Sequence, residues 1–314
     1  MQSKIGFGTA AIGRPQYINI RKEGSTDFEL ETFRQDGMKM LDEAYHLGIR
    51  YFDTAPGYGL AERLLIDWSK THHDIEIATK WGYTYVADFN TNARVHEVKE
   101  HSLAKLNEQW NQSKLLLPGL TTYQIHSATF ESGVLENDVV LNRMAAMKAE
   151  HRLRIGLTTT GANQLEVLKQ ALEVAVNGEL LFDAFQVTYN IFDQSIAAVA
   201  SLFEDQDRRL IIKEALANGR TFPNERYPQY ASAYEQLQHL ANAYQVGLDA
   251  IALRFCMDSI PAFKVLSGAT IPQHLSDNLK AEHIELSQAD IQILKELAIS
   301  PEAYWSERKQ LVWN

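Results

Sequence analysis

Four side chains in the sequence have the types and the placement needed to move a proton: Asp53, Tyr58, Lys80 and His126. Asp53, Lys80 and His126 each stand at or just after the end of a short β-branched or aromatic segment, and Tyr58 follows in the loop after Asp53. If those segments are parallel strands of one barrel, the four side chains meet at its mouth. Each type alone is usually structural, as a turn residue, a solvated lysine or a packed histidine. Their joint placement therefore predicts an active site.

A tyrosine beside a lysine suits general-acid catalysis. The pKa of a free tyrosine is near 10, so it gives up its proton reluctantly at neutral pH. We expect the Lys80 ammonium to favour the tyrosinate and lower the pKa of Tyr58, with Asp53 keeping Lys80 charged and fixed. His126 would donate to, or orient, the oxygen that receives the proton. A carbonyl that takes a hydride at carbon needs such a donor at oxygen, and a positioned general acid contributes about 10²–10⁴-fold in rate.

Short apolar segments alternate with helical patterns along the whole chain. Eight of them have the composition of strands, at 5–7, 49–52, 75–77, 122–125, 153–157, 184–187, 210–212 and 263–266. Apolar residues at helical spacing predict helices over 38–45, 61–68, 95–110 and 165–176, the first ended by Gly48. Strict alternation predicts a parallel sheet of the α/β class, and eight units favour a closed (β/α)₈ TIM barrel.

Length and composition fit one such barrel. The chain has 314 residues, of which 45% are apolar and 22% charged, which is ordinary for a folded protein. No Ser/Gly/Pro-rich linker interrupts the series, so we expect a single domain over 1–314. The longest irregular stretches are predicted at 13–26, at 217–230 and in a C-terminal tail at 300–314, which we expect near the substrate mouth.

Charge and cysteine content exclude several classes of function. Thirty Lys and Arg against forty Asp and Glu give a net charge of −10, which disfavours nucleic acid and anionic membranes as partners. The only cysteine, Cys256, permits no intrachain disulfide and no cysteine zinc cluster. The N-terminal segment has no apolar run, and no window reaches the ~18 apolar residues of a membrane span. We therefore expect a cytoplasmic protein; the sequence leaves its oligomeric state open.

Short motifs in a fixed order carry a family resemblance over essentially the full chain. They read GFGT at 6–9, FDTAPGYG at 52–59 with Glu62 after it, ATKWG at 78–82, QIH at 124–126, RIG at 154–156, QVTYN at 186–190, LANG at 216–219 and SG at 267–268 leading to Asn278. With them the sequence resembles the aldo-keto reductases. The resemblance implies a (β/α)₈ barrel that uses NADP or NAD to interconvert a carbonyl (aldehyde, ketone or aldose) and an alcohol. It also implies Tyr58 as the general acid or base, with Asp53, Lys80 and His126 as its catalytic partners.

The resemblance implies a cofactor site on the later strands. Thr158 and Thr159 replace the family's Ser-Asn pair at the nicotinamide, whereas its glutamine is retained as Gln186. Lys213 stands where the family commonly has a stacking aromatic residue, so its amine is the expected substitute near the ring or the phosphates. The expected cofactor-binding residues are Thr158, Thr159, Gln186, Lys213, Leu216, Asn218, Ser267, Gly268, Thr270, His274, Asp277 and Asn278.

The loop that begins at Ser267 bears on the choice of cofactor. It enters a helix, whose first N–H groups suit a phosphate. NADPH-preferring members add Lys or Arg here, but none occurs between Ser267 and Leu279, and His274 is the only candidate cation. We therefore predict a weakened preference for NADPH and use of NAD. Trp81 and Trp305 are predicted to border a substrate pocket whose aromatic walls suit a sugar ring or an aromatic aldehyde.

Three other interpretations fit parts of the sequence. The segment 6–11 fits G-x-G-x-x-A of a dinucleotide-binding fold, but Gly13 and Pro15 interrupt the helix that should follow it. A nucleotide-binding sensor or scaffold barrel with little turnover is the main alternative, and the intact catalytic set argues against it. A metal hydrolase needs several His or carboxylate ligands at strand ends, and only His126 and Asp53 are there, so no metal site is expected.

Overall fold

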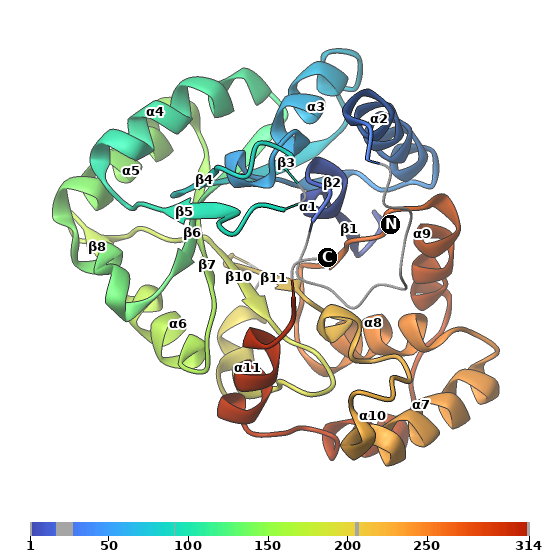
Figure 1. The fold of residues 1–314 in the computed structure, drawn as a ribbon. Coiled ribbons are helices and arrows are strands. Elements are labelled where there is room, and N and C mark those ends of the chain that lie inside the picture. The colour runs from blue at the N-terminus through green and yellow to red at the C-terminus, as the bar shows by residue number, and fades with distance from the viewer. Residues whose placement is uncertain (1, 17–27, 91, 205–206, 313–314) are drawn as a thin grey trace.

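The computed structural model describes residues 2–16, 28–90, 92–204 and 207–312. Eight parallel strands close into a barrel at the centre of the molecule, with helices around it (Figure 1). Their order around the barrel is β1-β12-β11-β10-β7-β6-β3-β2. The barrel strands are β1 (Ile5–Gly8), β2 (Tyr51–Asp53), β3 (Glu76–Trp81), β6 (Leu120–Ala128), β7 (Arg154–Thr159), β10 (Ala184–Thr188), β11 (Arg209–Lys213) and β12 (Lys264–Ser267). Each overlaps one of the eight predicted segments, so the (β/α)₈ fold is confirmed.

The helices are α1 (Ala10–Gly13), α2 (Leu30–His46), α3 (Ala61–Trp68), α4 (Leu103–Ser113), α5 (Asp138–His151), α6 (Gln164–Glu173), α7 (Ala231–Tyr244), α8 (Leu248–Ser259), α9 (Pro272–Leu279), α10 (Gln288–Lys295) and α11 (Pro301–Lys309). The helices predicted over 38–45 and 61–68 are confirmed within α2 and α3. Gly48 follows α2 with φ +92°, a conformation that favours glycine. No helix in the described part of the chain is long and apolar enough to cross a membrane.

Three predictions of local structure need correction. The helix expected over 95–110 begins only at Leu103, where Ser102 accepts a hydrogen bond from Lys105 N. Val98 lies instead in β5 (Glu97–Lys99), which pairs with β4 (Tyr83–Tyr85) in an antiparallel hairpin. Helix α6 ends at Glu173 before a second small hairpin, β8 (Ala175–Val176) with β9 (Glu179–Leu180). The tail expected to be irregular contains α11, capped by Ser300.

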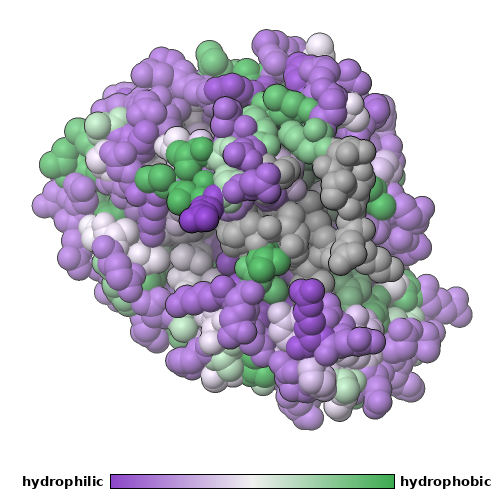
Figure 2. All heavy atoms as spheres, viewed as in Figure 1, coloured by the Kyte–Doolittle hydropathy of each residue, from purple (hydrophilic) through white to green (hydrophobic). Residues whose placement is uncertain are grey.

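The irregular stretch predicted at 13–26 falls mostly on 17–27, outside the described residues. That at 217–230 holds only short 3₁₀ turns, as expected for a connecting segment. The face of the molecule shown in Figure 1 is largely hydrophilic at its rim, with small apolar patches between (Figure 2).

Side chains along each barrel strand point alternately outward and inward, so the barrel has one apolar layer under the helices and another inside it. Outward-facing residues such as Phe52, Ile77 and Ile155 pack under the helices in the main core. A smaller cluster fills the barrel interior and consists of Tyr51, Ala78, Ala184, Ile211 and Leu266. Side chains two residues apart on a strand point to the same face. The positions two residues after these five are Asp53, Lys80, Gln186, Lys213 and Gly268, which are polar, charged or without a side chain. The apolar interior therefore ends in a polar layer at the carboxyl ends of the strands, where TIM barrels build their active sites.

Candidate active site

An ion pair lies at the centre of the polar layer. Lys80 Nζ is 2.5 Å from Asp53 Oδ2 and also donates to the carbonyl of Thr54 at 3.0 Å. The side chain of Lys80 is fully buried and that of Asp53 is 4% exposed. Gln186 Nε2 donates to the other Asp53 oxygen at 2.7 Å. Asp53 thus accepts one hydrogen bond on each oxygen, which fixes both Lys80 and Gln186 toward the barrel axis.

Tyr58 and His126 lie above this pair. The Tyr58 hydroxyl is 3.4 Å from His126 Nε2, and Lys80 Nζ is 4.8 Å from the centroid of the Tyr58 ring. Tyr58 ends the 3₁₀ turn Pro56–Tyr58, and His126 lies where β6 shifts register against β7. Ser127, next in the chain, has φ +54°, and such irregularities re-aim a strand side chain beside an active site. The structure therefore brings Asp53, Tyr58, Lys80 and His126 together.

Arg14, which sequence reasoning missed, fixes the loop that carries Tyr58. Its guanidinium donates to the Gly57 carbonyl at 3.1 Å and to Glu97 in β5 at 2.7 Å. It is 3% exposed and lies 5.4 Å from the Tyr58 ring centroid. Leu60 N also donates to the carbonyl of Gly13 at 2.7 Å. The only signal in the sequence was a lone arginine directly after the apolar segment 10–13.

The pKa of Tyr58 departs from the expectation. Burial and the nearby Asp53 carboxylate raise it well above 10, and Arg14 opposes this rise. The predicted lowering by Lys80 was wrong in direction, because burial of the phenol raises its pKa most, and Asp53, which binds Lys80 at 2.5 Å, adds its own negative charge near the phenol. The phenol therefore stays protonated at neutral pH.

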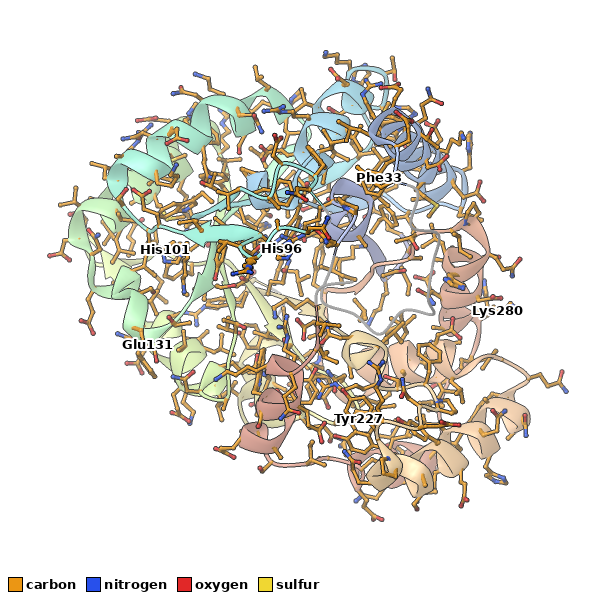
Figure 3. The ribbon with its side chains drawn as sticks, viewed as in Figure 1. Phe33, His96, His101, Glu131, Tyr227 and Lys280 are labelled. Atoms are coloured by element: carbon orange, nitrogen blue, oxygen red, sulfur yellow. The ribbon has the colours of Figure 1, made fainter. Side chains whose placement is uncertain are left out.

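His126 is held as a neutral imidazole. Burial, together with the charges of Lys80 and Arg14, lowers its pKa well below 6.5. His101 Nε2 donates to the His126 carbonyl at 2.9 Å, and the Tyr83 ring lies 4.7 Å from the His126 ring. Figure 3 shows His101 near β5, at the side of the mouth where the β4–β5 hairpin lies. These contacts fix the backbone and ring of His126 beside the tyrosine hydroxyl.

A groove of about 980 Å³ opens beside the polar layer, within the size range of ligand sites. It runs along the segments that follow β11 and β12 and along α9 to Asn278, and it includes Asp249 of α8. Seven of the expected cofactor residues line it: Leu216, Asn218, Gly268, Thr270, His274, Asp277 and Asn278. A Cβ added at Gly268 would meet no atom within 4 Å, so the backbone there faces open space. Shape and exposed backbone fit a dinucleotide.

The lining of this groove is acidic. Glu214, Asp249 and Asp277 contribute carboxylates, whereas His274 is the one basic side chain among the described lining residues. Lys280, one residue beyond α9, is ion-paired with Asp277 at 2.7 Å. The groove therefore offers a bound phosphate little positive charge besides the N-terminus of α9.

The remaining expected cofactor residues have different surroundings. Thr158 pairs in register with Gln186, and its hydroxyl accepts a hydrogen bond from Ser127 N at 2.7 Å. Thr159 is fully buried and donates to Gln164 of α6, so it faces away from the mouth.

Ser267 is also turned inward. It is 1% exposed, and its hydroxyl donates to Asn278 Oδ1 at 2.6 Å, which holds the loop before α9.

The two tryptophans expected at the substrate pocket are both buried. Trp81 is fully buried in the main core, 5.4 Å from the His101 ring, because it follows the inward-facing Lys80 and so faces outward. Trp305 is 3% exposed and donates its indole N–H to Asp193 at 3.0 Å. Its ring lies 5.7 Å from Lys213 Nζ, which places it, unlike Trp81, beside the polar layer.

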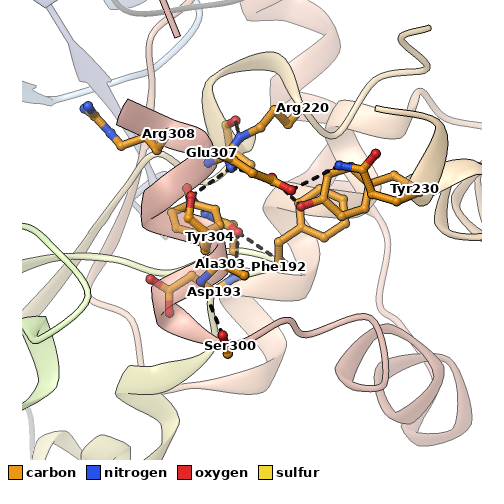
Figure 4. Close-up of polar contacts among 12 residues, drawn as sticks. Phe192, Asp193, Arg220, Tyr230, Ser300, Ala303, Tyr304, Glu307 and Arg308 are labelled. Carbon is orange, nitrogen blue, oxygen red and sulfur yellow. Dashed lines mark hydrogen bonds and ion pairs between the residues drawn. The ribbon is translucent and has the colours of Figure 1, made fainter. Parts of the chain in front are cut away.

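Helix α11 fastens the segments around the groove. Glu307 accepts hydrogen bonds from Arg220 at 3.1 Å and from the Tyr230 hydroxyl at 2.5 Å (Figure 4). Arg308 forms a two-pronged ion pair with Glu214, with distances of 2.6 and 3.1 Å to Glu214 Oε1. The C-terminal helix therefore holds the loop after β11, which lines the groove.

Comparisons with known proteins agree with this architecture. A model of the aldo/keto reductase family matches residues 4–299. A protein described as NADH-specific methylglyoxal reductase, from Escherichia coli (strain K12), is 25% identical over 329 aligned positions, which cover 94% of each chain.

Two solved structures share the fold. An aldo-keto reductase from Bacillus halodurans in its holo form has a TM-score of 0.70 at 22% identity, over 95% of this chain and 93% of that one. A glycerol dehydrogenase from Gluconobacter oxydans has a TM-score of 0.70 at 19% identity, over 94% of this chain and 91% of that one. Because the family model spans nearly the whole sequence, the chain belongs to the aldo/keto reductase family of oxidoreductases.

Proposed function

We propose that this protein uses NADH to reduce a small aldehyde or ketone, or an aldose, and runs the reverse reaction when the alcohol is in excess. The observation that carries the proposal is the position of the Tyr58 hydroxyl. It lies 3.4 Å from His126, above the buried Asp53–Lys80 pair. A groove that fits a dinucleotide opens next to these residues.

The residues at the mouth have different roles in the proposed reaction. A bound reduced nicotinamide supplies the hydride. Tyr58 donates its proton to the carbonyl oxygen, and its raised pKa means that the phenol is protonated at neutral pH. Neutral His126 orients the same oxygen, and the Asp53–Lys80 pair fixes the charge below the phenol. In alcohol oxidation, Tyr58 accepts the proton instead.

The acidic groove supports NADH rather than NADPH. A 2′-phosphate is held best by Arg or Lys, whose hydrogen bonds to phosphate are charge-assisted. The described lining of the groove holds three carboxylates and only His274 as a base. The methylglyoxal reductase relative, with 94% of its length aligned, is itself described as NADH-specific. A measured preference for NADPH above a hundredfold would contradict this part of the proposal.

The decisive experiment is turnover of a panel of aldehydes, ketones and aldoses by the wild type and by Tyr58→Phe, with NADH and with NADPH. We expect Tyr58→Phe to lose about 10²–10⁴-fold in kcat, because the general acid is gone. Tyr83→Phe is the matched control, since its ring also contacts His126 but plays no part in the proposed proton transfer.

Two results would count against the proposal. Equal turnover by Tyr58→Phe and the wild type would remove Tyr58 from the mechanism. Nucleotide binding without turnover of any substrate would favour the alternative, a nucleotide-binding sensor or scaffold.

A further inference from the structure

Lys213 is a charged residue of the polar layer that has no part in the proposed proton transfer. It ends β11 and follows Ile211, a residue of the barrel's interior cluster, by two positions. It pairs in register with Thr188 of β10, two residues after Gln186. Lys213 therefore points into the mouth from the side of β10 and β11.

The contacts of the Lys213 ammonium hold it in place without neutralising it. Its Nζ donates to the Thr188 hydroxyl at 2.7 Å and lies 5.7 Å from the Trp305 ring centroid. The neighbouring carboxylate, Glu214, is instead bound by Arg308 through two hydrogen-bonded nitrogens. Among the described residues, none forms an ion pair with Lys213, so its charge remains available to a bound group.

The groove places that group beside Lys213. Its lining starts at Glu214, the next residue in the chain, whereas Tyr58 and His126 lie across the mouth on the loop after β2 and on β6. A ligand that fills the groove and extends toward Tyr58 passes over the polar layer at the ends of the strands, of which Lys213 is a member. The part of the ligand nearest the reaction therefore passes within the field of Lys213.

A nicotinamide ring carries a positive charge when oxidised and none when reduced. A neighbouring ammonium that forms no ion pair raises the free energy of the oxidised form and leaves that of the reduced form nearly unchanged. We propose that Lys213 makes the site discriminate against the oxidised cofactor, so that the protein binds NADH more tightly than NAD⁺. This inference rests on the proposed function.

The charges around Lys213 make the bias depend on pH. Burial, with Arg308 of α11 and Lys80 of β3, lowers the pKa of Lys213 to about 8, whereas Glu214 and Asp193 oppose this. Asp193 lies in the segment after β10 and accepts from Trp305. The ammonium is present at pH 7 and is lost as the pH rises through 8. The discrimination should shrink over the same interval.

The test is fluorescence titration of the full chain with NADH and with NAD⁺, which reads binding rather than turnover. For the wild type at pH 7 we expect a dissociation constant for NAD⁺ at least about tenfold above that for NADH. In Lys213→Met, NAD⁺ should bind about tenfold more tightly while NADH changes less than threefold. Lys213→Arg should keep the wild-type ratio, and the exposed Lys169→Met should change neither constant.

A second measurement varies the pH instead of the cofactor-binding residues. The wild type titrated from pH 6.5 to 9.5 should lose its discrimination with a midpoint near 8, whereas Lys213→Met should show no such change. Equal weakening of both cofactor forms in Lys213→Met, or a wild-type ratio independent of pH, would overturn the inference but leave the proposed function intact. Failure of the wild type to bind either form would overturn the proposed function itself.

Discussion

Replacing Lys80 by Met tests the buried ion pair on which the site is built. The side chain of Lys80 is fully buried and that of Asp53 is 4% exposed, so water cannot solvate the carboxylate once its partner is removed. Methionine fills a similar volume without charge. The hydrogen bond from Gln186 to Asp53, at 2.7 Å, is left to stabilise the negative charge. Lys80→Met therefore creates a buried charge without its counter-ion.

The expected cost follows from that geometry. Removing one partner of a buried pair costs about 3–5 kcal/mol. With an unfolding entropy of about 2.1 cal/mol/K per residue, a chain of 314 residues loses roughly 5–8 °C in Tm for that change. The double variant Asp53→Asn/Lys80→Met removes both charges, so we expect it to recover most of this loss. Neither variant should reach wild-type activity, since both lack the Lys80 ammonium below Tyr58.

Differential scanning calorimetry at pH 7, with turnover measured on the same samples, checks both statements. Lys70→Met is the matched control: Lys70 is paired with Asp67 at 2.8 Å, but its side chain is 68% exposed. An exposed pair contributes little, so its Tm should move by less than about 1 °C. A similarly small change for Lys80→Met would refute the reasoning. So would a double variant as unstable as the single one.

Three further predictions concern pH and packing. Because the pKa of Tyr58 is raised, its acid form persists, so kcat for reduction should stay flat from pH 7 to 10; a fall centred below pH 9 would contradict this. Burial opposes ionisation of Glu214, but Arg308 and Lys213 lower its pKa to about 2, against 4.5 when unfolded. Its charge therefore contributes about 3 kcal/mol that is present above pH 4.5 and lost as the pH falls to 2; Glu214→Gln should lower Tm at pH 6 and lose that deficit at pH 2.5. In Gly13→Ala the new Cβ would lie 2.1 Å from the Tyr58 carbonyl oxygen, so kcat should fall more than tenfold, whereas Gly8→Ala, with its nearest neighbour at 3.5 Å, should retain most activity.

The number of barrel strands could be predicted because buried parallel strands have a recognisable local sequence pattern. Each is a short apolar run, and several of the strands end at the mouth on a polar residue, as in the step from Phe52 to Asp53. The hairpin of β4 and β5 has no such pattern in its sequence. Val95 and Val98, 58% and 49% exposed, match helical spacing by chance, and only the cap at Ser102 locates the true start of α4.

The part of the site that escaped prediction depends on contacts between distant segments. Arg14 is 43 residues from Gly57 and 83 from Glu97, so no local pattern reveals that it holds the catalytic loop. The sign of the Tyr58 pKa shift was missed for a related reason. No local pattern shows that the fold buries the Tyr58 phenol, which raises its pKa most, or that Lys80 is paired with Asp53.

The alternation of the strands links the core, the reaction centre and the cofactor bias. One set of inward positions packs the barrel interior, and the next position on the same face of each strand supplies a functional group: Tyr51 leads to Asp53, Ala184 to Gln186 and Ile211 to Lys213. Because each functional side chain is anchored two residues beyond a buried one, its position is set by the same packing that stabilises the barrel. An exchange at the outer position, such as an aromatic residue for Lys213, leaves that packing in place. A substitution at Lys213 can therefore change the relative affinity for the two cofactor forms while Tyr58, across the mouth, keeps its position.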